Sequence, residues 1–127
     1  MQDRPDAREL LQALEEFMQE RSDAATDRYD RFQFRVAANT LAILQRELAQ
    51  DDDYMREEWA GLDRLLGPEE MPERMLDRAH RVRERNGDLG ARIRRGDFDG
   101  ESEEDLLRHI YTTVWNKVTI ANPREAV

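Results

Sequence analysis

The 127-residue sequence contains no cysteine, which excludes disulfide bonds, thiolate metal ligands and cysteine nucleophiles. It has no run of 18 apolar residues, and no apolar segment typical of a secretion signal follows Met1. We therefore expect neither a membrane span nor export, and we expect a cytoplasmic location. The length fits one domain covering residues 1–127.

Basic residues are outnumbered, at 20 Lys and Arg against 29 Asp and Glu, which gives a net charge of −9. Such a chain would bring negative charge against phosphate, so a general nucleic-acid-binding function is not expected. Lysine is nearly absent, because Lys117 is the only one and the other basic residues are arginine. A coding bias explains this composition, and so does a need for planar, bidentate hydrogen-bond donors; the sequence does not separate the two.

Residues that favour strands or break helices are scarce. The β-branched residues number only 14, and neither Gly nor Pro occurs between Pro5 and Gly61. Apolar residues recur at helical spacing instead. We predict an all-α fold, a mostly antiparallel bundle of about five helices joined by short links. The expected helices cover residues 5–21, 28–50, 54–66, 72–95 and 102–121.

The second expected helix, residues 28–50, is apolar on several faces and should lie at the centre of the bundle. Asp51–Asp53 is expected to end this helix and to cap the next one. Gly67-Pro68 marks the end of the third. The fourth contains Asn86-Gly87, a pair typical of turns. Because its apolar residues keep heptad spacing across this pair, we favour one continuous helix over two short ones.

Enzyme signatures are scarce, since the two serines stand at expected caps or loops and there is no Gly-rich phosphate loop. Asp77 and His80 have the carboxylate–imidazole spacing of helical metal sites, but the second such pair that a di-iron bundle needs is missing. We therefore predict no catalytic residue, no metal and no cofactor. His109 belongs to a polar stripe of the last helix, which either lines a pocket, with His109 as acid or base, or faces water.

Arg35 and Asn39 stand one turn apart in the central helix, beside small residues that allow another helix to approach closely. If they are buried, both side chains need hydrogen-bond partners. One interpretation is a structural network that fixes this helix to a terminus, through Asn122 or the chain after Pro123. The other is a polar pocket for a carboxylate or phosphate, with His109 as a further member.

A stripe of arginines runs along the fourth expected helix. Residues 74–95 carry a net charge of +5, whereas residues 97–105 carry −6. Pairing between these segments, within one chain or between two, is one explanation. Docking of an acidic partner or an anionic ligand, or self-association, is slightly favoured because the charges are so strongly segregated. The stripe consists of Arg74, Arg78, Arg81, Arg85, Arg92 and Arg95.

Four segments spread along the chain carry a family resemblance: Arg4-Pro5-Asp6-Ala7, Arg35-Val36-Ala37-Ala38-Asn39, Ala91-Arg92-Ile93-Arg94 and Ala121-Asn122-Pro123-Arg124. They resemble an uncharacterised family of small bacterial helical proteins, a domain of unknown function. Genes of that family often lie beside those of aminoglycoside-phosphotransferase-like kinases and acyl-CoA dehydrogenases. Histidine is common in the family where Gln33 stands here, so no imidazole role is expected at that position. The resemblance implies a gene neighbourhood but no biochemical activity.

These observations favour a non-catalytic accessory or interaction protein. Its expected partner, implied by the resemblance, is an acyl-CoA dehydrogenase or a phosphotransferase-like kinase. The alternative is a small-ligand binding protein or enzyme, with a pocket around Arg35 and Asn39 that accepts acyl-CoA or a phosphorylated hydroxy acid. A third hypothesis is a homo-oligomeric scaffold.

Overall fold

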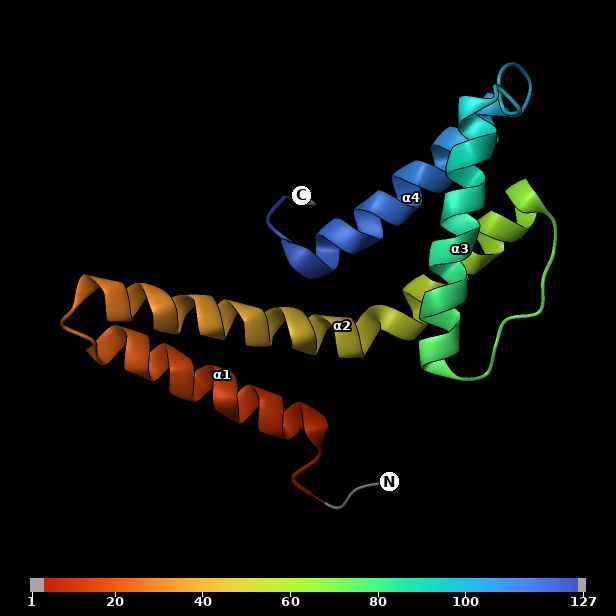
Figure 1. Cartoon of the computed structure of the whole chain (residues 1–127). Helices are drawn as coiled ribbons and strands as arrows, with labels where there is room; N and C mark the ends of the chain where they lie inside the picture. The colour runs from red at the N-terminus through yellow and green to blue at the C-terminus, as the bar shows by residue number, and fades with distance from the viewer. Residues whose placement is uncertain (1–3, 126–127) are drawn as a thin grey trace. The chain divides into compact units, whose positions relative to one another are not determined.

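The computed structural model describes residues 4–125, and over that range it contains helices and loops but no strand. The all-α prediction is confirmed, but the described residues form four helices rather than five (Figure 1). Within this range no helix combines the length and the apolar character that crossing a membrane requires. The helices are α1 (Ala7–Ala24), α2 (Arg28–Leu66), α3 (Met75–Arg94) and α4 (Glu103–Ala121).

The missing boundary lies at Asp51–Asp53, where α2 continues without a break from Arg28 to Leu66. Aspartates are weak helix formers, but each costs less than about 0.7 kcal/mol relative to alanine in a helix. The apolar pattern also stays in phase, because Leu48 and Met55 are seven residues apart and so lie on the same face. The predicted helix end at residue 50 is therefore wrong.

Helix α1 begins at Ala7 rather than at Pro5, because Asp6 is its N-cap. The Asp6 side chain accepts a hydrogen bond from the Glu9 backbone N–H at 3.0 Å. The Glu9 side chain in turn accepts one from the Asp6 backbone N–H. This reciprocal capping box satisfies two backbone donors and fixes the start of the helix. The helix then runs to Ala24, three residues beyond the predicted end.

Helix α3 begins at Met75 rather than at Pro72, so the segment after Gly67 is a longer loop than expected. It then runs unbroken through Asn86-Gly87 to Arg94, which confirms the continuous helix. Heptad spacing of the buried residues outweighs the local turn preference of this pair, since packing on one face stabilises the helix on both sides of it.

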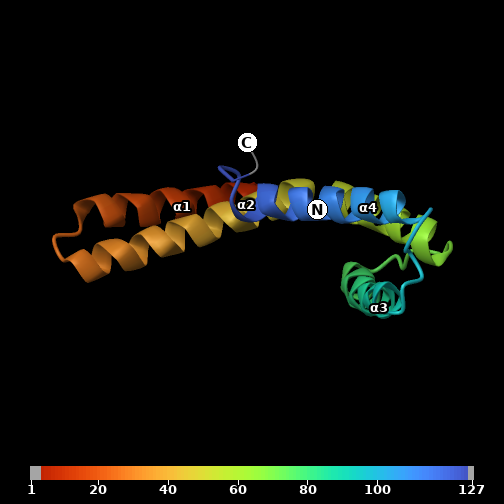
Figure 2. The ribbon, with the colours of Figure 1, turned by 90° about the horizontal axis from the view of Figure 1, so that it is seen from above.

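The chain divides into two compact units, one of residues 4–52 with 119–125 and the other of Asp53–Val118. Helix α2 contributes its first part to one unit and its last part to the other. In the first unit, α1 and the first part of α2 run side by side and antiparallel in both views (Figures 1 and 2). Their connection is fixed by buried Ser22, whose hydroxyl donates to the Arg31 carbonyl at 3.0 Å.

The second unit contains an apolar core built from the last part of α2, α3, α4 and the loop between α3 and α4. Its buried side chains are Trp59, Leu62, Val82, Leu89, Phe98 and Leu106. Leu62 is completely buried. By contrast, Ala38 is the only buried apolar residue among the described residues of the first unit. Burial of apolar surface therefore stabilises the second unit far more than the first.

Gly61 provides a test of how closely α2 and α4 pack in the second unit. A Cβ atom at Gly61 would lie 2.0 Å from His109 Nδ1, well inside van der Waals contact. We expect Gly61→Ala to lower the free energy of unfolding by about 1–3 kcal/mol, because the imidazole must move out of a packed site. Chemical denaturation followed by circular dichroism measures this change.

Gly87→Ala is the matched control, since Gly87 is also helical and nothing lies within 4 Å of an added Cβ. Alanine there should raise the free energy of unfolding by about 0.5–1 kcal/mol through helix propensity. Equal effects of the two substitutions would contradict the close packing of His109 on α2.

Candidate functional site

Arg85, one of the six arginines of the expected docking stripe, lies inside the second unit with only 2% of its surface exposed. Its Nη1 donates to Asp63 Oδ1 and its Nη2 to the Gly67 carbonyl, both at 2.9 Å. The guanidinium also lies over the Trp59 ring, 4.6 Å from the ring centroid. A buried cation needs such compensation. Arg85 is thus an internal residue and not part of a surface.

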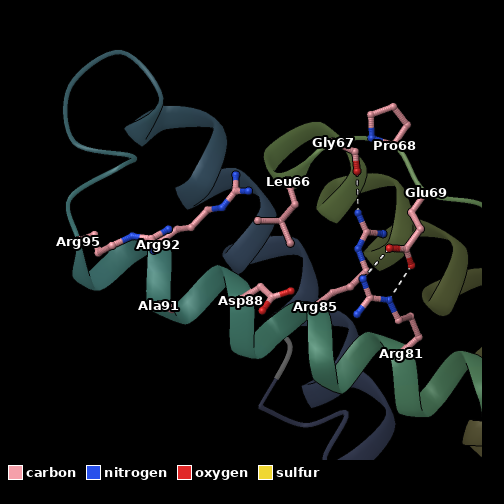
Figure 3. A pocket seen from close by; sticks show the side chains of 10 residues that line it. All are labelled: Leu66, Gly67, Pro68, Glu69, Arg81, Arg85, Asp88, Ala91, Arg92 and Arg95. Carbon is pink, nitrogen blue, oxygen red and sulfur yellow. Dashed lines mark hydrogen bonds and ion pairs between the residues drawn. The ribbon is translucent and has the colours of Figure 1, made fainter.

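Two further arginines of the stripe bind the loop that precedes α3. Arg81 donates from Nε and Nη2 to the two carboxylate oxygens of Glu69, at 2.7 and 2.6 Å (Figure 3). These hydrogen bonds lower the pKa of the Glu69 carboxyl and raise that of Arg81. Arg78 Nε donates to the Pro72 carbonyl at 2.5 Å. These two arginines therefore pair within the chain, and their partners lie in this loop and not in the acidic segment 97–105.

The other three arginines of the stripe lie nearer the surface. Arg92 and Arg95 line a cavity of about 420 Å³ together with Arg81 and Arg85 (Figure 3). Arg95 pairs with Asp97 at 3.2 Å, the one ion pair between the six arginines of the stripe and segment 97–105 among the described residues. Arg74 is exposed at the N-cap of α3. Because Glu69 and Asp88 also line this cavity, its positive charge is partly compensated.

Arg35, Asn39 and Asn122 come together at a larger cavity, in the first unit. This cavity has a volume of about 630 Å³ and lies between α2 and the C-terminal segment. Arg35 and Asn39 are exposed rather than buried, and neither side chain hydrogen-bonds to another described residue. The other lining residues are Gln19, Ala42, Ile43, Arg46, Ala121, Pro123 and Arg124.

The contact that fixes α2 to the C-terminal segment is made by Arg46, whose Nε donates to the Ile120 carbonyl at 2.7 Å. One of the two interpretations of Arg35 and Asn39 from the sequence gives this role to them. Arg46 follows Arg35 by eleven residues, three helical turns, so helical spacing alone could have placed it on the same face. Arg124 was also missed as a cavity residue, although it stands two positions after Asn122.

His109 belongs to the second unit, whereas Arg35, Asn39 and Asn122 belong to the first. It is 7% exposed, so this part of the polar stripe does not face water. It lines a small cavity of about 160 Å³ with Glu58 and Lys117. Burial lowers the pKa of His109, while the negative charge of Glu58 opposes that effect.

Buried Glu58, which sequence reasoning did not single out, has two partners in this part of the structure. Its Oε1 accepts hydrogen bonds from Asn86 Nδ2 at 3.2 Å and from Lys117 Nζ at 3.4 Å. The carboxylate, the amide and the ammonium therefore connect α2, α3 and α4. With His109 neutral and packed on Gly61, this cluster is explained by the packing of three helices, and it leaves little room for a substrate.

Comparison of the sequence with known protein families shows which family the chain belongs to. The family described as "Domain of unknown function (DUF6285)" matches residues 24–125. The chain belongs to the DUF6285 family. This result confirms the resemblance to an uncharacterised family, and the matched region contains every residue of the 630 Å³ cavity except Gln19. The chain matches none of the curated proteins and none of the solved structures with which it was compared.

Arg85 generates a stability prediction for this DUF6285 protein. Arg85→Met keeps an apolar stem but removes the guanidinium from Asp63, which keeps only the Glu69 N–H, and from the Gly67 carbonyl. We expect a loss of about 2–4 kcal/mol in the free energy of unfolding, less than for a fully buried pair because Asp63 is 29% exposed. Urea denaturation measures the loss.

Arg83→Met is the matched control, because Arg83 is exposed on the same helix and the substitution removes the same charge. It should change the free energy of unfolding by less than about 0.5 kcal/mol. If Arg85→Met has no larger effect than Arg83→Met, the buried guanidinium does not stabilise the unit as described.

His109 generates a prediction about pH. Since its pKa in the folded protein lies below the ordinary value of 6.5, the unfolded chain takes up a proton more readily than the folded one. Stability should therefore fall as the pH drops below about 6.5, until the lowered folded pKa is passed. Wild type should lose more stability between pH 7.5 and 5.5 than His109→Gln does.

Glutamine removes the titrating imidazole and keeps a polar side chain, so the comparison with the wild type isolates the contribution of His109. A His109→Gln variant with an unchanged pH dependence would show that burial of this imidazole does not set it.

Proposed function

We propose that this DUF6285 protein is a non-catalytic interaction protein that binds its partner through the first unit. The observation that carries the proposal is the apolar surface that α1 and the first part of α2 leave open. Eight large apolar side chains of this unit are exposed, whereas Ala38 is its one buried apolar residue among those described. They are Leu10, Leu14, Phe17, Tyr29, Phe32, Val36, Leu44 and Leu48.

These side chains are arranged at helical spacing and are not scattered. Leu10, Leu14 and Phe17 share one face of α1, since they recur at i, i+4 and i+7. Tyr29, Phe32 and their neighbour Val36 recur in the same way on α2. Single exposed apolar residues are normal on a protein surface, but an ordered apolar face marks an interaction site. The unit thus presents two amphipathic helices whose apolar faces are only partly covered.

The partner that we propose is the acyl-CoA dehydrogenase or phosphotransferase-like kinase to which the family resemblance points. A second copy of this chain is a less favourable occupant, because each copy carries a net charge of −9. Helix α1 alone has five carboxylates against two arginines, so two such faces repel each other at low ionic strength. A partner with basic residues around an apolar groove would complement both the apolar face and the acidic residues that surround it.

Co-expression with each of the two candidate partners tests the proposal. The tagged protein should retain one of them through purification at low salt. Phe17→Asp should weaken retention about tenfold, because a partner would no longer cover a ring that is 52% exposed in the free chain. Quantitative pull-down, with light scattering of the isolated protein, measures both retention and self-association.

Gln12→Asp is the control on the same helix, since it introduces the same charge at an exposed position away from the apolar face. It should leave retention unchanged. Failure of both candidates to bind at low salt would overturn the proposed partnership. A dimer by light scattering that Phe17→Asp dissociates would instead assign the apolar face to self-association.

A further inference from the structure

We propose that the 630 Å³ cavity of the first unit binds a small molecule through a phosphate or carboxylate group. This inference does not rest on the exposed apolar side chains, because none of the eight is among the described residues that line the cavity. It rests on the charge of the lining residues, on their free hydrogen-bond donors and on the dimensions of the cavity.

The described residues of the lining are positive and include no carboxylate. Arg35, Arg46 and Arg124 contribute three guanidinium groups, and no Asp or Glu is among the lining residues. This is unusual in a chain with 29 acidic and 20 basic side chains. The cavity of the second unit differs in this respect, because its arginines share the lining with Glu69 and Asp88.

The donors of this cavity are also largely unoccupied. Neither Arg35 nor Arg124 forms a hydrogen bond or ion pair with another described residue, and Arg46 uses only its Nε, on the Ile120 carbonyl. A guanidinium has five N–H donors in a planar fork that matches the oxygens of a phosphate or carboxylate. The side-chain amides of Asn39 and Asn122 add N–H donors that can bind the same oxygens.

The backbone explains why these groups converge. Arg35, Asn39, Ala42 and Arg46 lie on one face of α2 and span roughly 16 Å along its axis. Helix α4 ends at Ala121, before a proline, and a turn closed by the Glu125 N–H on the Asn122 carbonyl follows. This turn places Asn122 and Arg124 in the wall opposite α2.

The dimensions and the remaining lining define the ligand class further. A volume of about 630 Å³ lies in the usual range for small-molecule sites. Ala42, Ile43, Ala121 and Pro123 provide apolar surface between the polar groups. Since Arg35 and Arg46 are three turns apart, the site suits an elongated anion with an apolar body, whose anionic group alone binds the same guanidinium groups.

Titration of the full-length protein with inorganic phosphate and, separately, with citrate tests the proposal at constant ionic strength. Arginine Nε–H resonances, observed by ¹H–¹⁵N NMR, report on each guanidinium. We expect the resonances of Arg35, Arg46 and Arg124 to shift in a saturable manner with at least one probe. A response to phosphate alone would assign the site to phosphorylated ligands, and a response to citrate alone would assign it to carboxylates.

Arg35→Gln should weaken binding of the effective probe at least tenfold, and because Arg35 is exposed the variant should remain folded. Arg124→Gln provides a second test that does not touch α2. The control is Arg8→Gln, which removes an exposed arginine of the same unit outside the cavity and should leave binding unchanged. Absence of saturable shifts with both probes, or equal weakening by Arg8→Gln, would overturn the proposal.

Discussion

The buried guanidinium of Arg85 is the interaction on which the second unit depends. Removing a cation from water costs several kcal/mol unless its donors and charge are satisfied. Asp63, the Gly67 carbonyl and the Trp59 ring provide this compensation together. Two of these groups stand at the end of α2 and in the turn that follows it. Gly67 and Pro68 end α2, and the hydrogen bond from Arg85 to the Gly67 carbonyl connects this turn to α3. One side chain therefore stabilises both the packing and the connection between the two helices.

The same geometry gives the scarcity of lysine a structural meaning at particular positions. Arg85 reaches two acceptors from two different nitrogens while its plane lies on Trp59, and Arg81 holds both oxygens of Glu69. A lysine ammonium has no planar fork and no flat face, so it would lose one acceptor in each case and, at position 85, the stacking on Trp59 as well. Coding bias can still supply arginine elsewhere. At these sites, however, the local contacts require the guanidinium.

Apolar periodicity predicted most of the fold, and the error at Asp51–Asp53 shows how local signals compete. Three aspartates look like a helix end followed by a cap, yet Leu48 and Met55 keep the same helical phase across them. At Asp51–Asp53 the helix continues as the spacing of the apolar residues indicates. The same spacing predicted the continuous helix through Asn86-Gly87 correctly. The burial of Arg85 could not be predicted, because its partner at Gly67 is a backbone carbonyl whose position exists only in the folded chain.

The candidate site was predicted in part, and the remaining error concerns burial. Arg35 and Asn39 were expected either to form an internal network or to line a pocket, and the structure places both at a cavity, solvent-exposed and without partners among the described residues. Because water satisfies their donors, the first unit can fold without pairing these charges. In the second unit, the donors of Arg81 and Arg85 are occupied by carboxylates and a carbonyl that folding itself provides. Arg35 and Arg124 of the first unit keep donors that face water, and an anion can replace this water without breaking any contact between described residues.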